Sequence, residues 1–122
     1  MVIDDEPIVC RRLKQILEKS GYEVDVFSNG ADAIRRLEEK PYDIIVTDLK
    51  MEGMDGMSIL ESVKHSSPET KVIMITGFAE METAKEAFRK GVFDFISKPV
   101  EVEVIKEVIS KARKEIYESK KQ

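Results

Sequence analysis

The sequence predicts one α/β domain with a parallel sheet between two layers of helices. Short runs of β-branched and aromatic residues alternate five times with longer stretches that have the periodicity of amphipathic helices. Glycines and prolines fall between these segments, where turns and helix ends require them. The connections are only a few residues long, which favours parallel strands joined by right-handed crossover helices. At 122 residues the chain can build one hydrophobic core.

Five runs have the composition of strands. The first, residues 1–3, is so short that we expect it to lack roughly three or four residues on its amino side. The second, residues 23–27, alternates between polar and apolar side chains with a period of two. Residues 44–47, 72–75 and 93–96 are compact and apolar, which is typical of strands covered by helices on both faces.

Five stretches carry apolar residues at helical spacing. Pro7 suits the first turn of the first helix, and Gly21 and Gly91 stand where the first and fourth helices end. Pro41 and Pro68 follow the second and third helices. The apolar stripes are Val9, Leu13, Ile16 and Leu17; Ala33, Ile34 and Leu37; Met57, Leu60 and Val63; Ala84, Ala87 and Phe88; and Ile105, Val108, Ile109, Ala112 and Ile116.

The last helix is longer than a small sheet needs, because its apolar spacing continues to Ile116 and Tyr117. A helix that extends beyond its domain usually continues into another segment or pairs with a copy of itself. We therefore expect residues 1–122 to form one domain, in which about residues 113–122 are a helical extension or linker toward an output domain outside this sequence.

Composition excludes several classes of protein. The chain has 24 acidic and 20 basic residues and a net charge of −4, which argues against direct nucleic-acid binding. No apolar run approaches the roughly 20 residues of a membrane span. Cys10 is the only cysteine, so no intrachain disulfide can form, and we expect a cytoplasmic protein.

Polar side chains follow four of the five predicted strands. Asp4 and Asp5 follow the first strand, Asp48 the third, Thr76 the fourth and Lys98 the fifth. The carboxyl ends of parallel strands meet at one edge of a sheet, where ligands bind. Each residue alone has an ordinary structural explanation, since an aspartate after a strand usually forms a turn or caps a helix. The combination predicts a functional site.

At this edge the carboxylates of Asp4, Asp5 and Asp48 would lie close together and repel one another. A divalent cation bound between them would remove that repulsion. Oxygen ligands without Cys or His favour a hard cation, and Mg²⁺ accepts a few carboxylates and water. Asp48 is the natural nucleophile toward an electrophilic phosphoryl group, because it is central and has no acidic neighbour in the sequence. Lys98 and Thr76 would neutralise and bind the oxygens of the transferred group.

With these residues the whole chain resembles the receiver domain of two-component response regulators. The motifs are residues 2–6 (VIDDE), 45–51 (IVTDLKM), 53–56 (GMDG), 72–77 (VIMITG) and 94–99 (DFISKP). The resemblance implies a flavodoxin-like (βα)5 sandwich whose five-stranded parallel sheet has the order 2-1-3-4-5. The sequence of residues 45–56 and 72–99 is most similar to receivers of enhancer-binding transcriptional activators (NtrC-like).

The resemblance implies that Asp48 is the phosphoacceptor and that it receives a phosphoryl group from a phosphohistidine of a sensor histidine kinase. It also implies that Asp4, Asp5, Asp48 and the backbone carbonyl of Lys50 hold Mg²⁺. The protein would then be a phosphorylation-controlled signalling switch, not an enzyme acting on other substrates.

The same resemblance assigns the switch. Thr76 and Lys98 would contact the phosphoryl oxygens, and Phe95 would turn inward when Thr76 moves toward the phosphate. The Lys98–Pro99 peptide bond is expected to be cis. The surface of the fourth helix, fifth strand and fifth helix would then change, which predicts a homodimer on phosphorylation or control of an output domain that regulates transcription.

Three positions near the acceptor affect rates or depart from the family pattern. Lys50 and Phe78 lie two residues beyond Asp48 and Thr76, where their bulk would slow attack by water, so we predict slow self-dephosphorylation. Glu52 replaces a proline that is frequent in the family, which alters the stiffness of the loop but not the chemistry.

Three other functions fit less well. A haloacid-dehalogenase-like phosphatase needs a second aspartate where this chain has Lys50. A flavin-binding module needs a loop rich in glycine, serine or threonine after the first strand, where the chain has residues 4–7 (DDEP). A receiver fold that is never phosphorylated usually loses one of the acid, threonine and lysine side chains that this chain retains.

Overall fold

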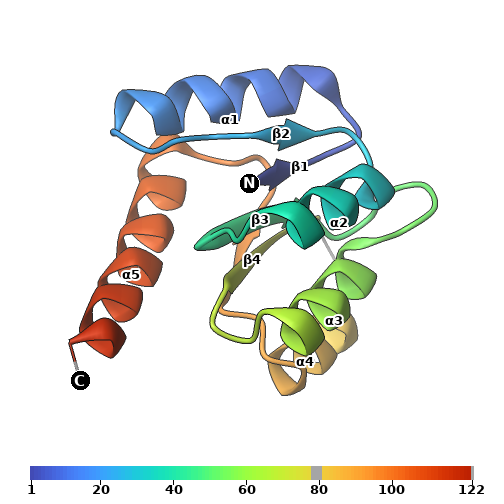
Figure 1. Ribbon diagram of the computed structural model, residues 1–122. Helices are drawn as coiled ribbons and strands as arrows, with labels where there is room; N and C mark the ends of the chain where they lie inside the picture. The colour runs from blue at the N-terminus through green and yellow to red at the C-terminus, as the bar shows by residue number, and fades with distance from the viewer. Residues whose placement is uncertain (78–80, 122) are drawn as a thin grey trace.

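The computed structural model describes residues 1–77 and 81–121. Within them lies a sheet of five parallel strands in the order β2-β1-β3-β4-β5 (Figure 1). This confirms the predicted flavodoxin-like topology. The strands are β1 (Val2–Ile3), β2 (Val26–Phe27), β3 (Ile44–Asp48), β4 (Lys71–Thr76) and β5 (Asp94–Ser97).

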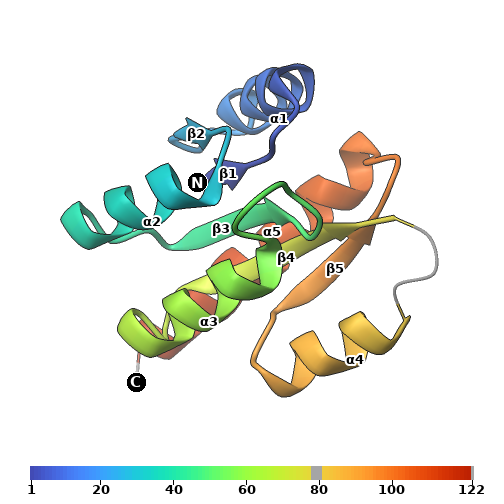
Figure 2. The ribbon, with the colours of Figure 1, turned by 90° about the vertical axis from the view of Figure 1, so that its right-hand side faces the viewer.

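Two layers of helices cover the sheet. Helices α1 and α5 pack on one face and α2, α3 and α4 on the other, as the two perpendicular views show (Figures 1 and 2). None of these helices combines the length and apolar character that a membrane crossing requires in residues 1–77 and 81–121. The helices are α1 (Pro7–Lys19), α2 (Gly30–Glu39), α3 (Gly56–Ser66), α4 (Met81–Arg89) and α5 (Val102–Lys120).

The helix ends follow the local chemistry of the sequence. Pro7 occupies the first turn of α1, and Asn29 and Asp55 cap α2 and α3 by accepting hydrogen bonds from backbone N–H groups of the first turn. Gly21 and Gly91 follow α1 and α4 with φ of 94° and 97°, the left-handed conformation that favours glycine at a helix end.

Alternation along the strands divides the core into two apolar clusters. Met1 and Ile3 belong to the cluster beneath α2, α3 and α4, whereas Val2 belongs to the cluster beneath α1 and α5. The same rule places Val46 and Ile45 on opposite faces of β3. Both faces of the central strands are therefore buried, which explains why their sequences are apolar without alternation.

The structure corrects two expectations. Strand β2 has only two residues, not residues 23–27, because it is an edge strand and can pair only along the short β1. Phe88 lies in the predicted apolar stripe of α4 but is 55% exposed, and its ring contacts Phe95 edge-on instead of entering the core. Among the described side chains of α4, only Ala87 is buried.

Candidate functional site

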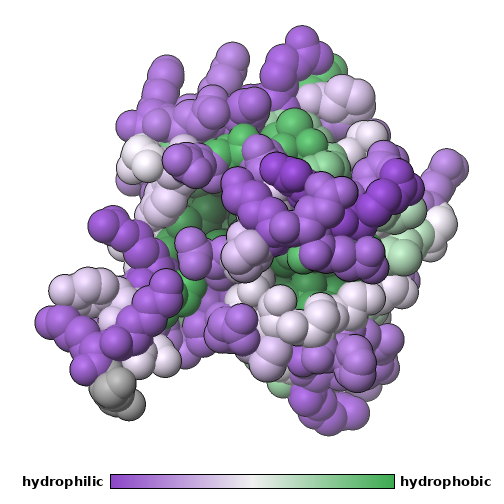
Figure 3. All heavy atoms as spheres, in the orientation of Figure 1, coloured by the Kyte–Doolittle hydropathy of each residue, from purple (hydrophilic) through white to green (hydrophobic). Residues whose placement is uncertain are grey.

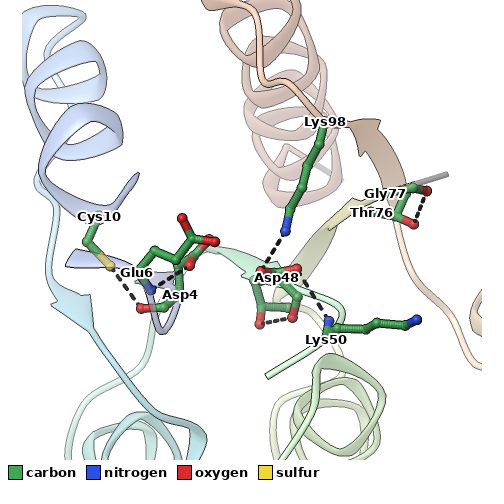
Figure 4. Close-up of polar contacts among 9 residues, drawn as sticks. Asp4, Glu6, Cys10, Asp48, Lys50, Thr76, Gly77 and Lys98 are labelled. Atoms are coloured by element: carbon green, nitrogen blue, oxygen red, sulfur yellow. Dashed lines mark hydrogen bonds and ion pairs between the residues drawn. The ribbon is translucent and has the colours of Figure 1, made fainter. Parts of the chain in front are cut away.

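The strands bring the predicted polar residues to one edge of the sheet, as Figure 4 shows. Asp48 ends β3 and Thr76 ends β4, while Asp4 follows β1 and Lys98 follows β5. The parallel register pairs Asp48 with Ile75 on β4, so the carboxyl ends of the central strands lie level. Asp4, Asp48, Thr76 and Lys98 therefore lie at the same edge of the sheet although they are far apart in the sequence.

Asp48 is a buried carboxylate with a cation beside it. Its exposed fraction is 2%, and the Lys98 ammonium donates a hydrogen bond to Oδ2 at 2.9 Å. The backbone N–H of Lys50 donates to Oδ1 at 3.3 Å. Burial by itself would lower the pKa of Lys98, but the hydrogen bond to Asp48 and the surrounding carboxylates raise it above its usual value. Lys98 therefore stays positively charged at neutral pH.

Asp4 is a second buried carboxylate, 1% exposed, on the neighbouring strand. Its Oδ1 accepts a hydrogen bond from the backbone N–H of Glu6 at 2.9 Å. The pKa of Asp4 is raised to about 6, mainly by burial; the bond from Glu6 opposes this change, and the charge of Asp48 adds to it. In the part of the chain that the structure describes, this edge of the sheet therefore places two buried acids, Asp4 and Asp48, near the ammonium group of Lys98.

The carboxylate oxygens of Asp4, Asp5 and Glu6 lie within 4.8 Å of one another. This group includes Glu6, the third acid after the first strand, which was not among the predicted metal ligands. It does not include Asp48, which interacts with Asp4 through its charge. The donors are all oxygen atoms and the buried charge is negative, so these residues fit a hard divalent cation.

Thr76 lies at the same edge but does not point at Asp48. Its hydroxyl donates to the carbonyl of Gly77 at 3.1 Å and is turned away from the carboxylate (Figure 4). Phe95 is half-buried on β5 and meets the ring of Phe88 at a centroid distance of 5.2 Å and an interplanar angle of 67°. Contact between Thr76 and a group on Asp48 would require a rotation of its side chain.

The remaining predicted site residues are Pro99, Lys50 and Phe78. The Lys98–Pro99 peptide bond is cis. The Lys50 side chain leads away from Asp48 in Figure 4, while its backbone faces the carboxylate. Phe78 lies outside the described residues.

Cys10 contributes to the site in a way that the sequence did not indicate. Its thiol is buried in α1 and donates to the backbone carbonyl of Asp4 at 3.2 Å. Burial raises the pKa of the Cys10 thiol, so the group remains a neutral donor. It thereby fixes the backbone of the acidic segment against α1.

Comparisons with known proteins agree with this arrangement. The family model of the response regulator receiver domain matches residues 1–110. The chain is 33% identical over 112 residues to the transcriptional regulatory protein ZraR of Salmonella typhimurium, covering 92% of this chain and 25% of that protein. It is 30% identical over 111 residues to the DNA-binding transcriptional regulator NtrC of Escherichia coli, covering 91% of this chain and 24% of that protein.

The chain therefore spans about a quarter of the length of the curated relatives it matches. Among solved structures, it is similar to a response regulator receiver domain protein from Clostridium thermocellum, with 33% identity, a TM-score of 0.88 and 95% of each chain covered. The sequence motifs, the strand order and these matches lead to one conclusion: the chain belongs to the response regulator receiver domain family, whose members are signalling domains of two-component systems.

Proposed function

We propose that Asp48 accepts a phosphoryl group from a phosphohistidine of a sensor histidine kinase. The observation that carries this proposal is the pairing of a buried carboxylate with an ammonium group, Asp48 with Lys98 at 2.9 Å, beside the second buried acid Asp4. A buried aspartate held next to one cation is poised for reaction with a dianionic group, because its own charge is already partly neutralised.

We propose that Asp4, Asp5, Asp48 and the backbone carbonyl of Lys50 hold Mg²⁺, with Glu6 beside them. The raised pKa of Asp4 supports this assignment, since burial and the charge of Asp48 both disfavour its ionised form in the absence of a cation. When bound, Mg²⁺ supplies positive charge that offsets the carboxylates and the incoming phosphoryl oxygens.

The transfer itself uses side chains of this chain. A carboxylate oxygen of Asp48 attacks phosphorus, an O–P bond forms, the N–P bond to the histidine breaks, and the electron pair stays with the imidazole nitrogen. Lys98 then exchanges its bond to Asp48 Oδ2 for one to a phosphoryl oxygen, which its long side chain permits. Thr76 rotates its hydroxyl from the Gly77 carbonyl toward another phosphoryl oxygen.

The rotation of Thr76 is the first step of the proposed switch. It leaves space next to Phe95, which moves inward and changes its edge-on contact with the exposed ring of Phe88. The surface formed by α4, β5 and α5 then changes its partners. The outcome is homodimerisation or control of an output domain, which for a chain similar to transcriptional regulators would regulate transcription.

We further propose that the only reactions catalysed are this self-phosphorylation and a slow dephosphorylation, in the cytoplasm. The side chains of Lys50 and Phe78 would both obstruct the path of a water molecule toward the phosphoryl group on Asp48, which would slow its hydrolysis. A half-life of the phosphoaspartate of only seconds would contradict this part of the proposal.

Intact-mass analysis after incubation with acetyl phosphate and Mg²⁺ tests the acceptor directly. We expect one added phosphoryl group on the wild type and on Asp43→Asn, an exposed carboxylate outside the site, and none on Asp48→Asn. Phosphorylation of Asp48→Asn, or none of the wild type, would overturn the assignment. Omitting Mg²⁺ should abolish the mass gain.

A further inference from the structure

Helix α2 meets the candidate site through its first residue. Residues 49–55, which we call the acceptor loop, join β3 to α3 and include Lys50, whose backbone N–H donates to Asp48. Gly30, the first residue of α2, is buried beside this loop. Both ribbon views show the start of α2 next to the loop (Figures 1 and 2). The phosphoryl transfer proposed above assigns no role to α2.

Space, and not backbone conformation, requires glycine at position 30. The φ of Gly30 lies outside the left-handed region, so an alanine could adopt the same backbone. A Cβ atom there would lie 2.8 Å from Cβ, 3.0 Å from Cγ and 3.1 Å from the carbonyl oxygen of Met54, whereas ordinary contacts of a Cβ lie at 3.4–4 Å. The Cβ and carbonyl oxygen of Met54 cannot swing aside as the end of a flexible side chain can. An alanine at this position would therefore displace either α2 or the acceptor loop.

The first turn of α2 is held firmly. The Asn29 side chain accepts a hydrogen bond from the backbone N–H of Asp32 at 2.8 Å and donates one to the Asp32 carboxylate at 2.9 Å. Ala33 is buried in the core cluster beneath α2, α3 and α4. Hydrophilic residues cover the outer side of this helix (Figure 3), so its packing contacts lie on the inner side. With the turn capped and packed in this way, a displacement falls mainly on the loop.

The acceptor loop is in turn packed closely against Asp48. Its two ends are joined, because the Gly56 N–H donates to the Leu49 carbonyl at 2.9 Å. A Cβ atom at Gly56 would lie 2.7 Å from the carbonyl oxygen of Asp48. Met54 precedes Gly56 by two residues and is half-buried against the same core cluster as Ala33. A shift of Met54 would therefore reach the backbone of Asp48 through a short, densely packed segment.

We propose that Gly30 is a positioning residue for the acceptor site. Its close approach to Met54 sets the position of the acceptor loop, and thereby the affinity for Mg²⁺ and the rate of phosphorylation. The inference rests on the roles proposed above for Asp48 and the Lys50 carbonyl, because Gly30 acts only through the loop. Such a coupling is reciprocal, so an ion bound at the acceptor loop should also stabilise the first turn of α2.

Gly30→Ala tests the contact, because helix propensity alone would make alanine in α2 favourable. We expect weaker Mg²⁺ binding in isothermal titration, by about tenfold, and slower phosphorylation by acetyl phosphate, by about tenfold. Ala31→Gly is the matched control, since it alters an exposed position of the same turn without adding an atom beside the loop. Unchanged affinity and rate in Gly30→Ala, or equal losses in Ala31→Gly, would overturn the proposal.

A double-mutant cycle with Met54 shows whether this contact causes the loss. Met54→Gly removes the Cβ and Cγ atoms that an alanine at position 30 would meet. Gly30→Ala should therefore weaken Mg²⁺ binding much less in the Met54→Gly background than in the wild-type background. Equal losses in the two backgrounds would mean that Gly30→Ala acts through another contact, and the proposal would fail.

Hydrogen exchange of the wild type requires no substitution and decides the question even if Gly30→Ala does not fold. Mg²⁺ should slow exchange in residues 30–39 as well as in residues 49–56. Slower exchange in residues 49–56 alone would overturn the inference and leave the Mg²⁺ site and Asp48 untouched. Unchanged exchange in both segments would contradict the Mg²⁺ site itself and, with it, the role of Gly30.

Discussion

Helices α3 and α4 lie on the same face of the sheet but are held in different ways. Helix α3 buries Ile59, Leu60 and Val63, and Asp55 caps its first turn. Helix α4 buries Ala87 alone among its described side chains and leaves Phe88 exposed. The helix that follows the acceptor loop is thus anchored, whereas the helix beside Phe95 is weakly packed. The proposed switch needs a rigid acceptor and a surface that can be displaced, and this difference supports such a division.

The largest expected effect is a difference in stability between a variant of α3 and a variant of α4. Leu60→Ala should lower the free energy of unfolding by about 2 to 5 kcal/mol, because it opens a cavity in the core. Phe88→Ala should cost about 1 kcal/mol, mainly from the contact with Phe95. Urea unfolding monitored by circular dichroism measures both. Similar losses for the two variants would remove the distinction between an anchored and a loosely held helix.

The second prediction concerns the cost of burying the Asp4 carboxylate at the edge of the sheet. Asp4→Asn should stabilise the metal-free protein at pH 7, by up to about 3 kcal/mol, because the folded-state pKa of about 6 lies above the 3.8 of an aspartate in the unfolded chain. The folded state binds the extra proton, so this penalty is present above pH 6 and disappears as the pH falls toward 4.

Urea unfolding at pH 7 and pH 4.5 checks the sign of this effect. The advantage of Asp4→Asn over the wild type should be large at pH 7 and small at pH 4.5. Glu38→Gln, an exposed control, should show no such change with pH. Weaker Mg²⁺ binding by Asp4→Asn, measured by titration, should accompany its greater stability. A variant less stable than the wild type at pH 7 would contradict the expectation.

The junction between the acceptor loop and α3 gives an intermediate effect. A Cβ atom at Gly56 would lie 2.7 Å from the carbonyl oxygen of Asp48 and 2.9 Å from Cα of Leu49. Gly56→Ala should therefore displace the acceptor backbone and cost about 1 to 3 kcal/mol. Gly77→Ala is the matched control, because a Cβ there meets nothing within 4 Å. If the displacement reaches Asp48, phosphorylation by acetyl phosphate should be slower in Gly56→Ala than in the wild type. The rate should stay unchanged in Gly77→Ala.

The smallest effect concerns the link between the two helices. The Lys90 ammonium, directly after α4, pairs with Glu61 on α3 and with Glu86 on α4. Glu61→Gln should change the free energy of unfolding by less than about 1 kcal/mol, since the pair is exposed. Hydrogen exchange should nevertheless accelerate in α4 and not in α3. Unchanged exchange in α4 would mean that this pair does not restrain the helix.

Local patterns in the sequence predicted α3 and α4 equally well, but they did not distinguish their packing. The apolar residues of both helices recur at helical intervals, Met57, Leu60 and Val63 on α3 and Ala84, Ala87 and Phe88 on α4. The apolar side of a helix is buried only where the sheet and the neighbouring helices cover it. Phe88 meets the ring of Phe95 and is still 55% exposed, which periodicity could not predict.

The sequence by itself determined the alternation of strands and helices, the parallel sheet and the convergence of Asp4, Asp48 and Lys98 at one edge. These follow from rules that act along the chain, namely side-chain periodicity, turn residues and the direction of parallel strands. Tertiary structure alone decided that the Cys10 thiol donates to the Asp4 carbonyl and that Phe88 stays 55% exposed against the ring of Phe95. These depend on how separate helices and strands meet after folding, because a side chain takes the partner that the neighbouring elements bring within its reach.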